Sequence, residues 1–114
     1  MIIYYNADCS KCREAIDLLN GASCEFEVRE YLKKPPTEQE LQVLLQKLRC
    51  KPFDLVRKSE PLYLEQFSGK AWTDTEWLHI LSTHPVLIER PVVIDGDRAI
   101  IGRPPVKVIE FIKQ

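Results

Sequence analysis

Hydrophobic positions near the start of the chain change from the spacing of a strand to that of a helix. Residues 1–5 are β-rich and short, as expected for a buried strand. From Cys12 onward, apolar residues recur at i, i+3, i+4 and i+7, which predicts a helix that stops at Gly21. The inner face of this helix is expected to consist of Cys12, Ala15, Ile16 and Leu19. Apolar and charged residues alternate over 24–29, so a second strand follows, parallel to the first after a right-handed crossover.

Two segments in the middle of the chain carry the signature of a helix N-terminus. Thr37 is followed by Glu40, and Thr73 by Glu76, and this spacing predicts a capping box at the start of each helix. The expected buried residues are Leu41, Leu44, Leu45 and Leu48 in the first helix and Trp77, Ile80 and Leu81 in the second. Residues 51–70 lack a regular pattern, so only a short helical segment is predicted there.

The last part of the chain predicts a hairpin and a closing helix. Two β-branched runs flank Asp95 and Gly96, a pair that suits a type I′ turn. Pro104 or Pro105 is then expected to start a helix. The inner face of that helix is expected to consist of Val108, Ile109 and Ile112. The predicted order is β-α-β, helices, β-hairpin and α, which describes an α/β fold with a mixed sheet covered by helices.

Composition fits one domain and argues against several function classes. A chain of 114 residues can bury its own core, so we expect a single domain over residues 1–114 with a helical insertion at about 37–84. The 16 lysines and arginines balance 17 aspartates and glutamates, and a net charge of −1 gives no general reason to bind nucleic acid or membrane. No apolar stretch is long enough to span a bilayer and no secretory signal is recognisable, so we expect a cytoplasmic protein. We also expect it to be a monomer.

Two of the four cysteines, Cys9 and Cys12, lie between the first strand and the first helix. Intracellular cysteines are expected to stay reduced, so reactive or buried thiols are favoured over structural disulfides. A thiol at the first turn of a helix lies near amides without partners and at the positive end of the backbone dipole, and both favour the thiolate. Lys11 and Arg13 add positive charge beside the pair. We therefore expect Cys9 to be an exposed nucleophile with a lowered pKa, and Cys12 to be the less accessible, resolving thiol.

The alternatives for the cysteines are a metal site and a purely structural role. A zinc site needs about four ligands, and the remaining candidates lack paired spacing, so no metal is expected. Those candidates are Cys24, Cys50, His79 and His84. The polar residues before Cys9 argue against a purely structural role for it, whereas Cys12 as a merely buried helix residue stays open. Cys24 is expected in the core, and Cys50 lies in an unassigned loop.

Three arginines adjoin the ends of predicted elements. Arg57 lies in the irregular segment, Arg90 just before Pro91 and Arg103 just before a pair of prolines. Guanidinium groups are planar forks that suit a tetrahedral oxyanion, and such groups around a thiolate also lower its pKa. Spacing alone favours ordinary surface arginines over an anion site.

Four motifs, NADC, LVRKSEP, HPVLIERPVVI and GRPP, occur in an order that resembles the ArsC family of arsenate reductases, the glutaredoxin-coupled type with a thioredoxin-like fold. The resemblance extends from the first residue to the last helix. It implies that Cys9 is the catalytic cysteine and that Arg57, Arg90 and Arg103 bind the anion. It also implies a cis peptide bond before Pro91, facing the active cysteine.

The resemblance further implies a mechanism without a bound cofactor. Arsenate lies among the arginines and the first helical amides, and the Cys9 thiolate attacks arsenic to form a covalent adduct. Glutathione, as co-substrate, takes up the oxidation, and glutaredoxin regenerates the cysteine. Two positions depart from the family. Cys12 creates a Cys-x-x-Cys, as in the related Spx regulators. A Cys9–Cys12 disulfide, reduced by glutaredoxin or thioredoxin, is therefore an alternative to the glutathione step. Tyr5 replaces a frequent family histidine, which leaves more of the thiolate stabilisation to the helix end and the arginines.

Two alternative functions follow from the same resemblance. Spx-like relatives are redox-sensing regulators that bind RNA polymerase and need no oxyanion site. Arg103, which completes the set of three arginines, favours the reductase over such a regulator. A thiol oxidoreductase of the same family with another substrate stays open.

Overall fold

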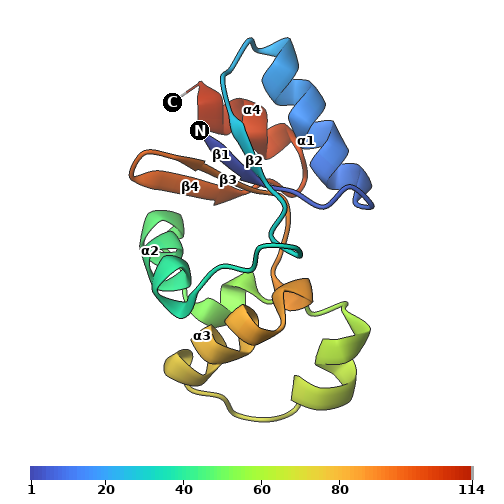
Figure 1. The fold of residues 1–114 in the computed structure, drawn as a ribbon, viewed down its shortest axis with the longest axis vertical. Helices are drawn as coiled ribbons and strands as arrows, with labels where there is room; N and C mark the ends of the chain where they lie inside the picture. Colours follow the sequence, from blue (N-terminus) through green and yellow to red (C-terminus); the bar gives the residue numbers. More distant parts are fainter. Residues whose placement is uncertain (114) are drawn as a thin grey trace. The chain divides into compact units, whose positions relative to one another are not determined.

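The computed structural model describes residues 1–113, which divide into two compact units. The first unit contains residues 1–34 and the chain from residue 90 onward, blue and red in Figure 1. The second unit contains residues 35–89, mainly green to orange in Figure 1. The helical insertion predicted at about 37–84 falls within the second unit.

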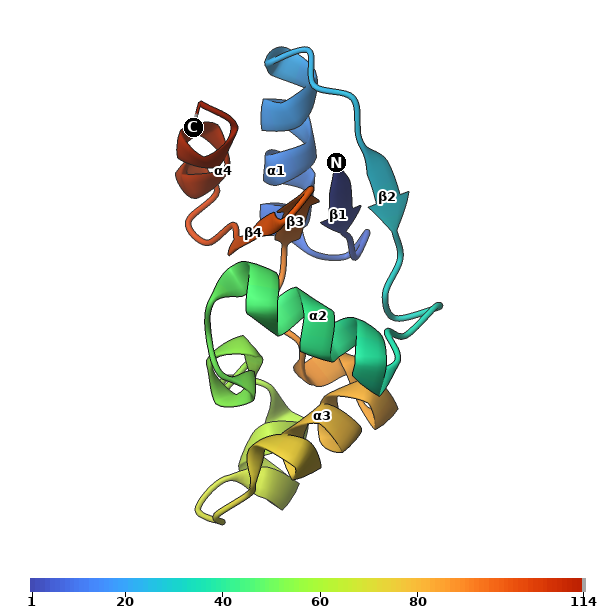
Figure 2. The ribbon, with the colours of Figure 1, turned by 90° about the vertical axis from the view of Figure 1, so that its left-hand side faces the viewer.

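The first unit is built on a four-stranded mixed sheet, as the sequence predicts. Its elements in chain order are β1 (Ile2–Tyr4), α1 (Ser10–Gly21), β2 (Glu27–Arg29), β3 (Val92–Asp95), β4 (Arg98–Ile101) and α4 (Val106–Ile112). The strand order is β2-β1-β3-β4; β1 and β2 are parallel, and β3 is antiparallel to both of its neighbours. Figure 2 shows α1 and α4 side by side against one face of this sheet.

The core of the first unit lies between the sheet and these two helices. It is formed by Ile3, Ala15, Leu19, Val93, Val108 and Phe111. The inner face predicted for α1 is confirmed, with only Ile16 half-buried. In α4 the prediction is partly wrong, because Phe111 is buried whereas Ile109 and Ile112 are half-buried. Val108 and Phe111 are an i, i+3 pair on one face of the helix, and Ile112 packs against the same core from the edge of that face.

The second strand is shorter and more exposed than predicted. β2 covers three residues and forms an edge of the sheet, so it is paired on one side only. Val28, an apolar residue of the predicted alternation, is 47% exposed, and Cys24, expected in the core, precedes the strand and is half-buried. All three residues of this edge strand are exposed or half-buried, so the alternation in the sequence does not correspond to a buried face within β2.

The predicted β-hairpin is present, but its turn differs from the prediction. Asp95 pairs with Arg98, so the two turn residues are Gly96 and Asp97. Positive φ occurs at Gly96 (62°) and not at Asp97. One positive φ, at a glycine in the first central position, indicates a type II′ turn, whereas type I′ requires two.

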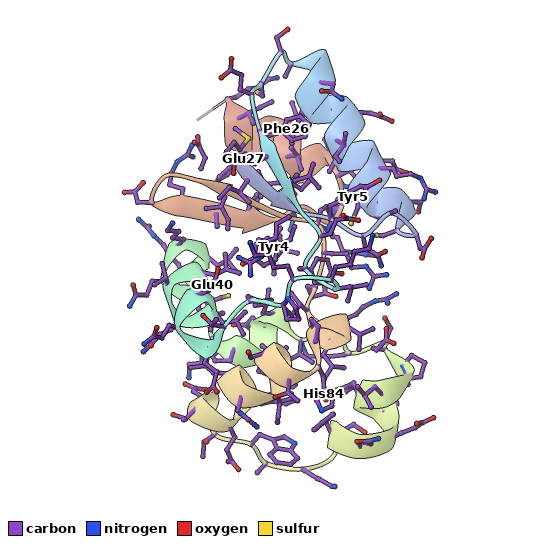
Figure 3. The ribbon with its side chains drawn as sticks, viewed as in Figure 1. Tyr4, Tyr5, Phe26, Glu27, Glu40 and His84 are labelled. Carbon is purple, nitrogen blue, oxygen red and sulfur yellow. The ribbon has the colours of Figure 1, made fainter. Side chains whose placement is uncertain are left out.

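The second unit is helical. Its elements are α2 (Glu38–Leu48), a 3-10 turn (Pro52–Leu55), a π-helical turn (Tyr63–Phe67), α3 (Asp74–Thr83) and a second 3-10 turn (Pro85–Leu87). Both predicted capping boxes are confirmed. The hydroxyl oxygens of Thr37 and Thr73 each accept the N3 amide at 3.1 Å. The backbone N–H of Thr37 donates to the Glu40 carboxylate, and that of Thr73 donates to the Glu76 carboxylate. These hydrogen bonds lower the pKa of Glu76. Glu40 is labelled in Figure 3.

Candidate active site

A tight turn, residues 6–9, joins β1 to α1 and places Cys9 immediately before the helix. The Cys9 amide donates to the carbonyl oxygen of Asn6 at 3.0 Å, and the Asp8 amide donates to the Asn6 side-chain oxygen at 3.1 Å. The guanidinium of Arg13 donates to the carbonyl oxygen of Ala7 at 2.6 Å. The turn is thus hydrogen-bonded from within and from the first turn of the helix. Tyr5, labelled in Figure 3, is half-buried at the start of this segment.

The sulfur of Cys9 lies beside a guanidinium from a distant part of the chain. Arg90 Nε donates to Cys9 Sγ at 3.3 Å, across 81 residues of sequence. Burial by itself raises the pKa of Cys9, but the hydrogen bond from Arg90, hydrogen bonds from the backbone and thiol of Cys12, and the charge of Arg90 together lower it to about 7. At pH 7, about half of the Cys9 population is therefore thiolate.

The expected exposure of Cys9 is wrong, because its side chain is 5% exposed. Lys11 and Arg13, predicted to add charge to the pair, bind elsewhere. Lys11 pairs with Glu14 at 3.8 Å on the helix surface, and Arg13 is used by the turn. The positive charge that acts on the sulfur comes from Arg90, whose own pKa is raised because the interactions with Cys9 outweigh its burial.

Cys12 differs from Cys9 in both burial and ionisation. Its side chain is fully buried on the inner face of α1, as predicted. Burial and, to a smaller extent, the neighbouring Cys9 raise the pKa of Cys12 to about 12, against lowering contributions from the Asn6 amide and Arg90. At neutral pH, Cys12 is therefore a thiol, and its interaction with the Cys9 sulfur favours the thiolate of Cys9.

Arg103 joins this group through the backbone of Arg90. Its guanidinium donates to the Arg90 carbonyl oxygen at 3.3 Å. The Gly102 amide donates to the Pro91 carbonyl oxygen at 2.8 Å, and a Cβ at Gly102 would lie 3.2 Å from the Pro91 ring. The peptide bonds before Pro91 and Pro104 are both cis, the first as the resemblance implies. The structure thus brings two of the three predicted arginines together with the cysteines.

Arg57 belongs to the second unit, where its backbone and side chain are both held. Its amide donates to the Leu87 carbonyl oxygen at 2.7 Å, next to a bridge between Val56 and Ile88. Its guanidinium forms a half-buried ion pair with Glu60 at 2.8 Å. The hydrogen bonds that connect the other site residues lie in the first unit.

A residue that no sequence pattern singled out is Tyr31. It is 1% exposed, and its ring stacks on that of Tyr4 with centroids 6.0 Å apart. Figure 3 labels Tyr4 at the end of β1. The Tyr31 phenol also acts electrostatically on Arg90. An isolated aromatic residue after a short strand has no spacing signal, so only the tertiary structure reveals it.

All four cysteines are free thiols. Cys50 is half-buried, which raises its pKa. Across residues 1–113, no group of three or more His, Cys, Asp or Glu side chains is arranged to hold a metal ion. Within the same residues, no helix is long and apolar enough to cross a membrane.

Comparisons with known proteins agree over nearly the whole chain. The model of the ArsC family matches residues 4–111. The arsenate reductase of Haemophilus influenzae is 37% identical over 114 residues, with 98% of each chain covered. A solved structure described as the arsenate reductase from Vibrio cholerae has a TM-score of 0.91 and 37% identity, covering 96% of this chain and 94% of that one. A putative arsenate reductase from Yersinia pestis has a TM-score of 0.89, 37% identity and coverage of 96% and 97%.

Proposed function

Since this chain belongs to the ArsC family and has its thioredoxin-like fold, we propose that it is an arsenate reductase whose nucleophile is Cys9. The observation that carries the proposal is the 3.3 Å hydrogen bond from Arg90 to the Cys9 sulfur. It places a thiolate beside a guanidinium that can also bind an oxyanion. The contact from Arg103 to the Arg90 carbonyl oxygen supports a shared anion site and favours the reductase over an Spx-like regulator.

The first chemical step is attack on arsenic. The Cys9 thiolate forms an S–As bond, while one As–O bond breaks and its oxygen, after taking up a proton, leaves as water. As the sulfur loses its negative charge, the guanidinium of Arg90 becomes available to the arsenate oxygens. The amides of Ser10 and Lys11 begin α1 and have no intrahelical acceptors, so they add donors to the same side. Arg57 is proposed as the third anion-binding arginine on the family resemblance.

The second step reduces the arsenic. A second thiolate attacks the Cys9 sulfur and a disulfide forms. The electron pair of the S–As bond stays on arsenic, which leaves as arsenite. We propose glutathione as this thiol, because Cys12 has a pKa of about 12 and is held as a thiol. Glutaredoxin then reduces the mixed disulfide.

Cys12 supports a second route for the same step. Its thiol already interacts with the Cys9 sulfur, so loss of its proton to the departing oxygen would turn it into a neighbouring nucleophile. The product would be a Cys9–Cys12 disulfide, which thioredoxin or glutaredoxin reduces. We further propose that the protein acts in the cytoplasm as a monomer, where these reductants are available.

Arsenate-dependent NADPH oxidation by the purified, reduced protein tests the proposal. One assay contains glutathione, glutaredoxin and glutathione reductase; the other contains thioredoxin and its reductase. We expect turnover in at least one assay, its loss in Cys9→Ser, and its retention in Cys24→Ser as the matched control. Absence of turnover in both assays would refute the reductase.

A further inference from the structure

The turn before Cys9 is held by two side chains that have no part in the chemistry proposed above. Asn6 accepts the Cys9 amide with its backbone oxygen at 3.0 Å and the Asp8 amide with its side-chain oxygen at 3.1 Å. The second contact is an Asx turn, in which asparagine takes the place of a backbone acceptor. Because both amides are used inside the turn, the backbone of Cys9 is fixed before the helix begins.

Arg13 holds the same turn from the helix. Its amide donates to the Cys9 carbonyl oxygen at 3.2 Å, in the first helical hydrogen bond. Its guanidinium reaches back six residues to the Ala7 carbonyl oxygen at 2.6 Å. The side chain therefore connects the first turn of α1 with the middle of residues 6–9. An arginine on the exposed face of a helix would otherwise extend into solvent.

We infer that Asn6 and Arg13 are positioning residues that hold the Cys9 sulfur against the Arg90 guanidinium, and so maintain its reactivity. This inference rests on the proposed role of Cys9 as the nucleophile. The side chains act through geometry: a sulfur at the end of a loose turn would lose hydrogen bonds whose strength depends steeply on distance and angle.

Several ionisable groups around the Cys9 sulfur must stay unchanged in the variants that test the inference. Arg90 precedes β3, Cys12 lies on α1, and Tyr31 acts on Arg90. Asp8 and Lys11 belong to the turn and the first helical turn. The variants below leave all five groups in place, except for one control that removes the charge of Lys11.

The test measures how the alkylation rate of Cys9 by iodoacetamide depends on pH, with the modified residue located by tandem mass spectrometry. For Asn6→Ala and Arg13→Gln, we expect the midpoint to rise by about one pH unit, the size of losing one hydrogen bond to a charged group. Asn6→Ser should fall between Asn6→Ala and the wild type, because a hydroxyl forms the same turn more weakly.

Two controls separate geometry from other effects. Asn20→Ala makes the Asn6→Ala change at an exposed position of α1, and Lys11→Gln removes a positive charge from the same first turn of the helix. We expect wild-type midpoints for both. A wild-type midpoint in folded Asn6→Ala, or equal shifts in Arg13→Gln and Lys11→Gln, would overturn the inference. Circular dichroism establishes folding, and if Asn6→Ala does not fold, Asn6→Ser and Arg13→Gln decide.

Alkylation needs no arsenate, so its outcome is separate from that of the proposed function. A wild-type protein that does not reduce arsenate but shows the expected midpoints in these variants would refute the reductase and support the positioning role. A wild-type protein that reduces arsenate, together with unshifted midpoints in the variants, would support the reductase and refute the positioning role.

Discussion

The contact between Arg90 and Cys9 makes a quantitative prediction for Arg90→Gln. The substitution removes the guanidinium charge and the Nε donor 3.3 Å from the sulfur, while the sulfur stays buried. Both losses destabilise the thiolate. In the wild type, the stabilising interactions lower the pKa of Cys9 from 9.0 to about 7 in spite of burial, and those of Arg90 are prominent among them.

The expected magnitude follows from this balance. A lowering of about 2 in pKa corresponds to about 2.7 kcal/mol of stabilisation of the thiolate, within the range of a hydrogen bond to a charged group. If Arg90→Gln removes that stabilisation, the pKa of Cys9 rises to 9 or above. The thiolate fraction at pH 7 then falls from about a half to about one per cent, so alkylation at pH 7 slows by about 50-fold.

Trypsin makes the assay simple, because it cleaves after Lys11 and separates Cys9 and Cys12 into different peptides. Iodoacetamide alkylation is followed from pH 5.5 to 10 by mass spectrometry of the peptide that contains Cys9. Lys107→Gln, an exposed position on α4, is the matched control and should keep the wild-type midpoint near 7. A midpoint that stays near 7 in Arg90→Gln would show that the helix end and Cys12 lower the pKa without Arg90.

Three further predictions concern the second thiol, the packing beside the site and the pH dependence of stability. Cys12→Ser should abolish turnover supported by thioredoxin and retain turnover with glutathione and glutaredoxin; equal losses in the two assays would contradict separate routes. Gly102→Ala places a Cβ 2.9 Å from a side-chain atom of α4 and should lower the free energy of unfolding by about 1–3 kcal/mol in urea titrations. Gly21→Ala, with no atom within 4 Å of its Cβ, should not lower it. Equal urea midpoints for the two variants would refute this account. Because the pKa of Cys9 is lower in the folded state, its contribution to stability is complete above pH 9 and is lost as the pH falls through 7. The free energy of unfolding should therefore rise between pH 7 and 9 in the wild type and change less in Cys9→Ser. Parallel pH curves for the two proteins would contradict this prediction.

Local sequence rules were sufficient for the parts of the fold that local contacts determine. The capping boxes at Thr37 and Thr73 depend on residues three positions away, and both were predictable from spacing. The hairpin was also predictable, but the dipeptide Asp95-Gly96 fits a turn at either of two registers. The pairing of Asp95 with Arg98 selects one of them, and it belongs to a strand register that the dipeptide itself does not encode.

In the candidate site, too, the features set by local sequence were predictable and those set by distant residues were not. The helix end at Cys9 and the inward phase of Cys12 follow from periodicity, and the order of their accessibility was predicted correctly. The burial of Cys9 and the source of its positive charge were not, because Arg90 is 81 residues away. Flanking basic residues were the nearest candidates in sequence, yet a helix directs Arg13 away from the sulfur and toward the preceding turn.

If Arg90 binds the anion as proposed, its pairing with Cys9 makes anion affinity depend on the oxidation state of the protein. In the reduced state, the guanidinium is already occupied by the thiolate, so an incoming oxyanion must share a cation that the sulfur neutralises. Once Cys9 is in a disulfide or an arsenic adduct, that negative charge is gone and the cation is free. If arsenate reacts as proposed, the covalent intermediate holds its own oxyanion group more tightly than the resting protein holds free arsenate, and phosphate, an anion of the same shape, should bind the oxidised protein more tightly than the reduced one.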